Sequence, residues 1–131
     1  MSKSKITWNG DNVIVKYSGS VNAKMFLENI ALVLRNPSLE RQVYHIKDML
    51  DVTEVDISEV EFQMFILIDR SLQKWKKDLN YILVVNPNLE EMANKYREAL
   101  GDTTWNFMTF YSIEEATNWA EEKVAEQLSS D

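Results

Sequence analysis

The best candidate for a chemical site in this sequence is a group of four acidic side chains between residues 48 and 56. Carboxylates grouped in this way are ligands that hard cations such as Ca²⁺ prefer. Their spacing matches no calcium-binding loop, and no glycine stands where such a loop turns. We therefore expect a solvated acidic loop and assign no metal and no cofactor to the chain. Catalysis with a divalent cation near the first of them is a third, less favoured hypothesis. The four residues are Asp48, Asp51, Glu54 and Asp56.

The residue types that most enzymes need are scarce. His45 is the single histidine and lies in a predicted strand, where a hydrogen-bonded core residue is the simpler interpretation than a base. Cysteine is absent, which excludes thiol catalysis and disulfides. The three glycines fall between predicted elements, and no phosphate-binding loop or serine-hydrolase elbow is present. We expect a protein that is not an enzyme.

Length and composition indicate one globular domain over residues 1–131. Hydrophobic residues make up 45% and charged residues 27% of the chain, and we expect a short flexible tail at 1–4 and a frayed end at 129–131. The net charge of −7 argues against binding to nucleic acid. The longest apolar runs have five residues, whereas a membrane span needs about 20. With no leader peptide in this sequence, we expect a cytoplasmic protein.

The hydrophobic pattern predicts five strands and four helices in the order ββαβαβαβα. Two strands form an N-terminal hairpin through Asn9-Gly10, a strong turn signal. Helical crossovers between the later strands imply a mixed, mostly parallel sheet covered by helices, an α/β fold. We expect strands at residues 6–8, 13–17, 42–49, 81–85 and 103–111.

Each predicted helix has a recognisable start. The first helix is capped by Ser20 or Asn22 and ends at Arg35, before Asn36-Pro37. The second begins at Ser58 and reaches Lys77. Three capping boxes are expected, each a cap residue with a glutamate three positions later. They are Ser58 with Glu61, Asn88 with Glu91, and Ser112 with Glu115.

The order of these elements and several short strings resemble the STAS domain, the fold of sporulation anti-sigma-factor antagonists. In that family the second strand ends in a glycine, as at Gly19, and two aspartates flank a short apolar loop after the third strand, as Asp48 and Asp56 do. The similarity covers nearly the whole chain and is greater to the unregulated STAS/CRAL-TRIO-like members. It implies a STAS-like fold and a binding or regulatory role. The C-terminal strings that carry it are Leu100-Gly101, Trp105, Phe107, Phe110 and Ser112 to Trp119.

The start of the second helix departs from the phospho-regulated members of that family. Those members carry Asp-Ser-(Ser/Thr)-Gly, with a serine that a kinase modifies. Here the string is Asp56-Ile57-Ser58-Glu59. Ser58 remains, and we expect its hydroxyl to cap the helix. A phospho-switch antagonist modified at Ser58 is the alternative function.

The second helix carries more apolar residues than one sheet-facing stripe requires. The expected stripe is Met64, Phe65, Ile68, Leu72 and Trp75, because these fall on one face at helical spacing. Phe62 and Ile66 lie off that face. A lipid-like ligand, a subunit partner or a neighbouring helix could each explain the excess.

These observations together predict a binding module at the second helix and the C-terminal edge of the sheet. A small apolar or amphipathic ligand, or a protein partner, is expected there, and homodimerisation through the same helix is a close variant. The predicted site residues are Asp48, Asp56 and Ser58 at the polar rim, with Phe62, Met64, Ile66 and Met25 for apolar contact.

Overall fold

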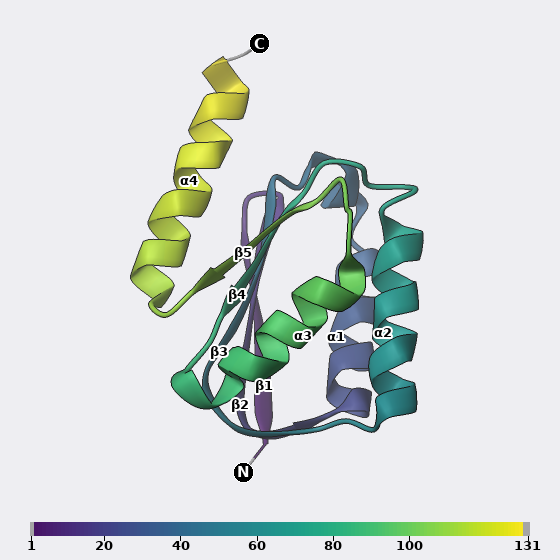
Figure 1. The fold of residues 1–131 in the computed structure, drawn as a ribbon. Helices are drawn as coiled ribbons and strands as arrows, with labels where there is room; N and C mark the ends of the chain where they lie inside the picture. Colours follow the sequence, from purple (N-terminus) through teal and green to yellow (C-terminus); the bar gives the residue numbers. More distant parts are fainter. Residues whose placement is uncertain (1, 130–131) are drawn as a thin grey trace.

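A computed structural model describes residues 2–129 and shows one sheet with helices on both faces (Figure 1). The strands are β1 (Lys3–Asn9), β2 (Asn12–Asn22), β3 (Tyr44–Asp56), β4 (Asn80–Val84) and β5 (Asn106–Phe110). The helices are α1 (Ala23–Leu34), α2 (Glu59–Leu72), α3 (Glu90–Leu100) and α4 (Ile113–Ser129), with short 3₁₀ turns η1 (Pro37–Arg41) and η2 (Pro87–Leu89).

The strands lie in the order β1-β2-β3-β4-β5, which confirms the predicted α/β architecture. β1 pairs with β2 antiparallel, and every later pair is parallel. The predicted hairpin is present, but its turn residues are Gly10-Asp11 and not Asn9-Gly10, since Asn9 pairs with Asn12 and Gly10 takes a φ of 63°. Glycine is favoured at the first turn residue of such a tight hairpin, because that residue has a positive φ.

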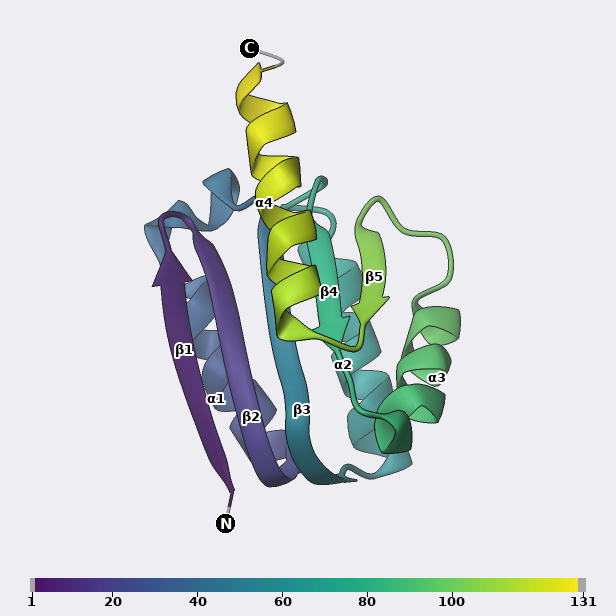
Figure 2. The same ribbon diagram turned by 90° about the vertical axis from the view of Figure 1, so that its left-hand side faces the viewer.

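Helices α1, α2 and α3 cover one face of the sheet, and α4 crosses the other (Figures 1 and 2). The larger core lies under the three helices and includes Val15, Phe26, Phe65 and Tyr81. A smaller core lies under α4, where Ala116 and Ala120 pack on strand residues from β3 and β4. The fold therefore separates two interiors, and only the first lies beneath α2.

Strand β3 extends seven residues beyond its predicted end at Met49, so the predicted acidic loop is wrong. Asp51 pairs in register with Ser18, and Asp56 pairs with Asn22. The Lys16 Nζ–Asp51 Oδ2 distance is 3.2 Å. Parallel pairing with β2, which is also long, satisfies the backbone of this part of β3. Local residue preferences alone do not reveal such pairing.

The structure corrects the predicted break at Gly19 and decides between the two predicted caps of the first helix. Gly19 does not end β2 but lies inside it, with a φ of 76° beside a register shift. Asn22 rather than Ser20 caps α1, because its side chain accepts a hydrogen bond from the Met25 N–H. A β-bulge is the usual setting for a glycine within a strand.

Helices α2 and α4 begin at their predicted caps, and α3 does not. Ser58 and Glu61 form the expected capping box, and Ser112 Oγ accepts a hydrogen bond from the Glu115 N–H. The predicted box of Asn88 with Glu91 is wrong: Asn86 caps η2 instead, and α3 begins at Glu90. Proline at the next position favours the shorter turn that starts at Asn86.

Helix α2 ends at Leu72, five residues before the predicted Lys77. Trp75 therefore lies beyond the helix and is 85% exposed, which corrects its assignment to the sheet-facing stripe. Phe65 is buried, and Met64, Ile68 and Leu72 pack against the larger core as predicted.

The predicted tail and frayed end fall partly outside the described residues, namely at Met1 and residues 130–131. Lys3 and Ser4 belong to β1, and Ser129 belongs to α4. Within residues 2–129, no helix combines the length and apolar character that crossing a bilayer requires.

Candidate functional site

Two cavities lie inside the larger core, between the sheet and the helices α1 and α2. The inner cavity has a volume of ≈ 60 Å³, and its walls come from α1, α2, α3, β3 and β4. The polar cavity has a volume of ≈ 50 Å³ and lies toward the other end of α2. The two cavities adjoin each other, since Ile30, Lys47, Asp69 and Tyr81 line both.

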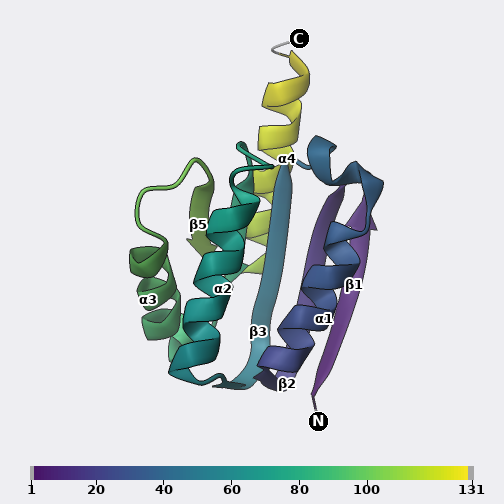
Figure 3. The ribbon, with the colours of Figure 1, turned by 90° about the vertical axis from the view of Figure 1, so that its right-hand side faces the viewer.

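A third hollow, the edge groove, opens on the surface at the C-terminal end of β3. Its volume is ≈ 430 Å³, and it runs between the first turns of α2 and α3. Figure 3 shows α1, α2 and α3 side by side on this face. The edge groove and the inner cavity share Val55, Ile57, Phe62 and Met92. These side chains thus form the partition between solvent and the interior.

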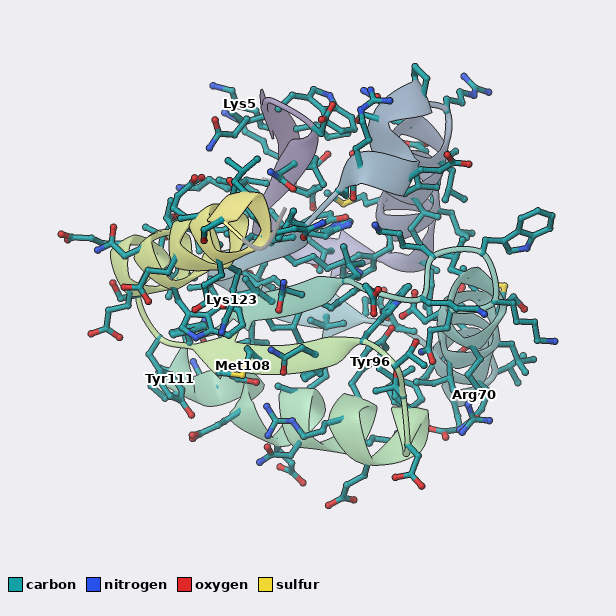
Figure 4. The ribbon with its side chains drawn as sticks, turned by 90° about the horizontal axis from the view of Figure 1, so that it is seen from above. Lys5, Arg70, Tyr96, Met108, Tyr111 and Lys123 are labelled. Atoms are coloured by element: carbon teal, nitrogen blue, oxygen red, sulfur yellow. The ribbon has the colours of Figure 1, made fainter. Side chains whose placement is uncertain are left out.

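Phe62 is the aromatic member of that partition. Its ring meets Tyr96 edge-on, with centroids 6.0 Å apart, and Lys95 Nζ lies 4.4 Å from its centroid. Lys95 also pairs with Glu59 at 2.7 Å. Tyr96 points from α3 toward the sheet and α2 (Figure 4). The Phe62 ring is therefore half-buried, with one aromatic contact and one cationic contact, both to residues of α3.

Two charged side chains of opposite sign line both cavities. Lys47 comes from β3, and its Nζ lies 5.5 Å from the Phe26 centroid and 5.1 Å from that of Tyr81. Asp69 comes from α2 and is 6% exposed. None of the ion pairs found in residues 2–129 joins the two groups directly. Their charges interact across the cavities instead.

Burial dominates the acid–base behaviour of these groups. It raises the pKa of Asp69 to about 6, and the nearby Lys47 ammonium opposes that rise. Burial likewise lowers the pKa of Lys47, with Asp69 opposing. His45 has its pKa lowered to about 3 by burial and then by Lys47, so this imidazole is neutral at pH 7.

Buried hydrogen-bonding atoms without a partner mark the polar cavity. Gln42 is 2% exposed, and neither its Oε1 nor its Nε2 has a protein partner. His45 Nε2 is likewise buried and unpartnered, while its ring stacks on Tyr81 at 5.4 Å. An unsatisfied buried polar group costs about 1–3 kcal/mol of folding free energy, so several in one place call for an explanation.

The predicted site residues are only partly brought together. Phe62 lies between the edge groove and the inner cavity. Met64 and Met25 are half-buried and pack against the larger core. Ile66 is 2% exposed and contributes to the wall of none of the hollows described above.

The predicted polar rim does not assemble around Phe62. Asp48 is 4% exposed, and strand alternation between Lys47 and Met49 directs it to the face that α4 covers. Its Oδ1 accepts a hydrogen bond from the Leu50 N–H at 3.2 Å. Asp56 is exposed at the end of β3, and Ser58 is exposed at the cap of α2.

The charged and amide residues of the cavities were missed by reasoning from sequence. A usable signal existed for Asp69, which lies four residues after Phe65 and three before Leu72, on the core-facing stripe of α2. Lys47 gave a similar signal, because it alternates with Ile46 and follows His45 by two in a buried strand. A charged residue at a core position indicates a functional or structural polar site.

The described part of the chain contains no group of three or more His, Asp or Glu side chains arranged to hold a metal ion. Tyr81 could act as an acid only at high pH, because burial raises its pKa well above the ordinary value. The arrangement is suited to holding a molecule that has an apolar part and a polar end.

Comparison with known proteins identifies the fold. No family model matches the chain, and no curated protein sequence does. Among solved structures, the chain is similar to an uncharacterized protein from the DUF3478 family with a SpoIIAA-like fold from Shewanella loihica PV-4. The TM-score is 0.59 at 16% sequence identity, covering 91% of this chain and 93% of that one. At this identity the likeness establishes a STAS-like fold and nothing about a ligand.

Proposed function

We propose that this STAS-like chain is a non-enzymatic binding module that takes a small apolar or amphipathic ligand beneath α2. The ligand would enter through the edge groove, displace the Phe62 ring and occupy the inner cavity. The observation that carries this proposal is the shared wall of those two spaces, since the Phe62 ring is one of the four side chains that lie between the surface groove and the apolar part of the core.

The size of the inner cavity determines how uptake would occur. Its ≈ 60 Å³ is well below the roughly 150 Å³ of an apolar cavity that accepts benzene, so side chains must move to admit a ligand. Methionines supply that adaptability, because an unbranched thioether repacks with little strain. Met49 and Met92 line the cavity, and Met25 and Met64 pack against the same core.

Native mass spectrometry of the purified protein tests the proposal, because it detects a retained small molecule and a dimer in one spectrum. We expect an added mass that is lost in Phe62→Asp, while the circular dichroism spectrum stays that of the wild type. Val60→Asp is the matched control, since Val60 lies on the same helix but is 80% exposed and outside the groove. The same added mass in Phe62→Asp would remove the basis for uptake past this ring.

The wild-type spectrum also separates the remaining alternatives. A spectrum that contains a dimer and no added mass would favour a subunit interface on α2 over a ligand. A monomer without any added mass, even after incubation with octan-1-ol, would refute the proposed uptake. A phosphate adduct on Ser58 would favour the switch function instead.

A further inference from the structure

The polar cavity gathers four polar side chains near the C-terminal end of α2, of which three are buried and Lys47 is half-buried. Gln42 precedes β3, His45 and Lys47 lie on one face of that strand, and Asp69 faces them from α2. Gln42 and His45 are each at least nine-tenths buried and have cavity-lining polar atoms that no protein group satisfies. Apolar packing alone gives no reason to place such groups together.

Lys47 and Gln42 supply the available hydrogen-bond donors of this cluster, and Gln42 Oε1 is an acceptor that also lacks a protein partner. The Lys47 ammonium has three N–H donors and contacts aromatic faces rather than a carboxylate, and the Gln42 amide has two N–H donors without a partner. Asp69 is the one carboxylate among the residues lining the polar cavity. The complementary ligand group is therefore a small anion with two acceptor oxygens.

We propose that the polar cavity binds the carboxylate of a chain-like monocarboxylic acid, whose apolar chain extends through the inner cavity toward Phe62. This inference rests on the proposed function and adds the chemical class of the ligand. Lys47 would pair with the carboxylate, and the Gln42 amide would donate a second hydrogen bond. Lys47 and Lys76 bring two positive charges to this cavity and Asp69 one negative charge, so a singly charged anion balances them, whereas a phosphate monoester would add excess negative charge.

The apolar part of the ligand has a defined direction. From Lys47 and Tyr81, the inner cavity continues between side chains without charge to the Phe62 partition. These side chains are Phe26, Met49, Phe65 and Leu83. A headgroup at Lys47 therefore places the chain against hydrocarbon and its far end at the edge groove.

Asp69 would oppose a second negative charge unless it takes up a proton. Burial already raises the pKa of Asp69 to about 6, and an anion that neutralises Lys47 removes the charge that opposes that rise. The other ionisable groups at this end are His45, which is neutral, Tyr81, which is un-ionised, and Lys76 at the outer wall. Carboxylate binding near pH 7 is therefore linked to uptake of a proton by Asp69.

Octanoate labelled with ¹³C at its carboxyl carbon is the probe, and octan-1-ol is the matched ligand without a carboxylate. We expect calorimetry at pH 7 to show octanoate binding at least tenfold more tightly than octanol, with a shifted carboxyl resonance. Lys47→Met should remove that preference, so that octanoate no longer binds more tightly than octanol. Lys24→Met, at an exposed lysine outside all three hollows, should alter octanoate affinity less than twofold, because the chain as a whole carries −7 and attracts no anion in general.

Two further readouts decide the matter should Lys47→Met fail to fold. Gln42→Met should weaken octanoate at least threefold with little effect on octanol. Proton uptake, measured by titrating octanoate in buffers of different ionisation enthalpy, should be present in the wild type and absent in Asp69→Asn.

Equal affinities for octanol and octanoate would overturn the carboxylate assignment while leaving ligand uptake intact. Octanoate binding that is insensitive to both Lys47→Met and Gln42→Met would overturn it as well. Binding of neither molecule would instead refute the proposed function, and the polar cavity would then hold water alone.

Discussion

His45 and Asp69, two buried ionisable groups of the polar cavity, should have opposite effects on how the free energy of unfolding changes with pH. The two effects should nearly cancel in the wild type, and replacing either residue should reveal the effect of the other. His45 is buried in the neutral form, with a folded pKa of about 3 against an ordinary value of 6.5. Asp69 has a folded pKa of about 6 against an ordinary value of 3.8. The unfolded chain therefore binds the histidine proton more readily, while the folded chain binds the aspartate proton more readily.

The signs and sizes follow from proton linkage. Between pH 7 and pH 5, the unfolded state gains a proton on His45, which lowers the free energy of unfolding by about 2 kcal/mol. Over the same interval the folded state gains a proton on Asp69, which raises the free energy of unfolding by about 1.3 kcal/mol. These two groups together leave a net change of well under about 1 kcal/mol in the wild type.

Between pH 7 and pH 5, Asp69→Asn should therefore lose about 1.3 kcal/mol more of its free energy of unfolding than the wild type does. Over the same interval His45→Gln should lose about 2 kcal/mol less than the wild type. Urea unfolding followed by tryptophan fluorescence at both pH values measures each difference, and the other titrating groups cancel in the comparison. Parallel pH profiles for the wild type and both variants would refute the assignment of buried, oppositely perturbed groups.

Two other predictions concern α2. Ile66→Ala should lower the free energy of unfolding by about 2–5 kcal/mol because Ile66 is 2% exposed, whereas Leu67→Ala, at 62% exposure, should change it by less than about 0.5 kcal/mol; similar losses in urea titrations would contradict the burial of Ile66. Ser58→Ala should cost about 1 kcal/mol by removing the hydroxyl that accepts from the Glu61 N–H, and a neutral result would show that this cap contributes nothing.

The capping of α2 also bears on regulation. Ser58 Oγ already serves the helix N-terminus, and Glu61 returns a hydrogen bond to the Ser58 backbone at 2.9 Å. A phosphate there would gain from the helix dipole but stand beside three carboxylates, those of Asp56, Glu59 and Glu61. The sequence departs from the regulated pattern at Ile57 and Glu59, and the structure provides a use for Ser58 that needs no kinase.

Local signals predicted most element types because they depend on neighbours in the chain. The glycine turn at Gly10, the Ser58–Glu61 cap and the Gly101 stop each act within a few residues, and each lies at an element boundary in the structure. The alternation of apolar and polar positions then predicted an α/β sheet, which the fold comparison confirms. The length of β3 could not be read in this way, because its last residues are held by pairing with β2.

By itself, the sequence determined the order of the elements, the mixed sheet and the apolar excess of α2, since periodicity and caps are properties of short segments. Tertiary structure alone decided where that excess lies: Ile66 is buried, Phe62 borders a groove, and Asp48 is on the opposite face. It alone also brought Lys47, Asp69 and Gln42 to one cavity, because their proximity arises from packing a helix across a sheet. No pattern within any one segment encodes that meeting.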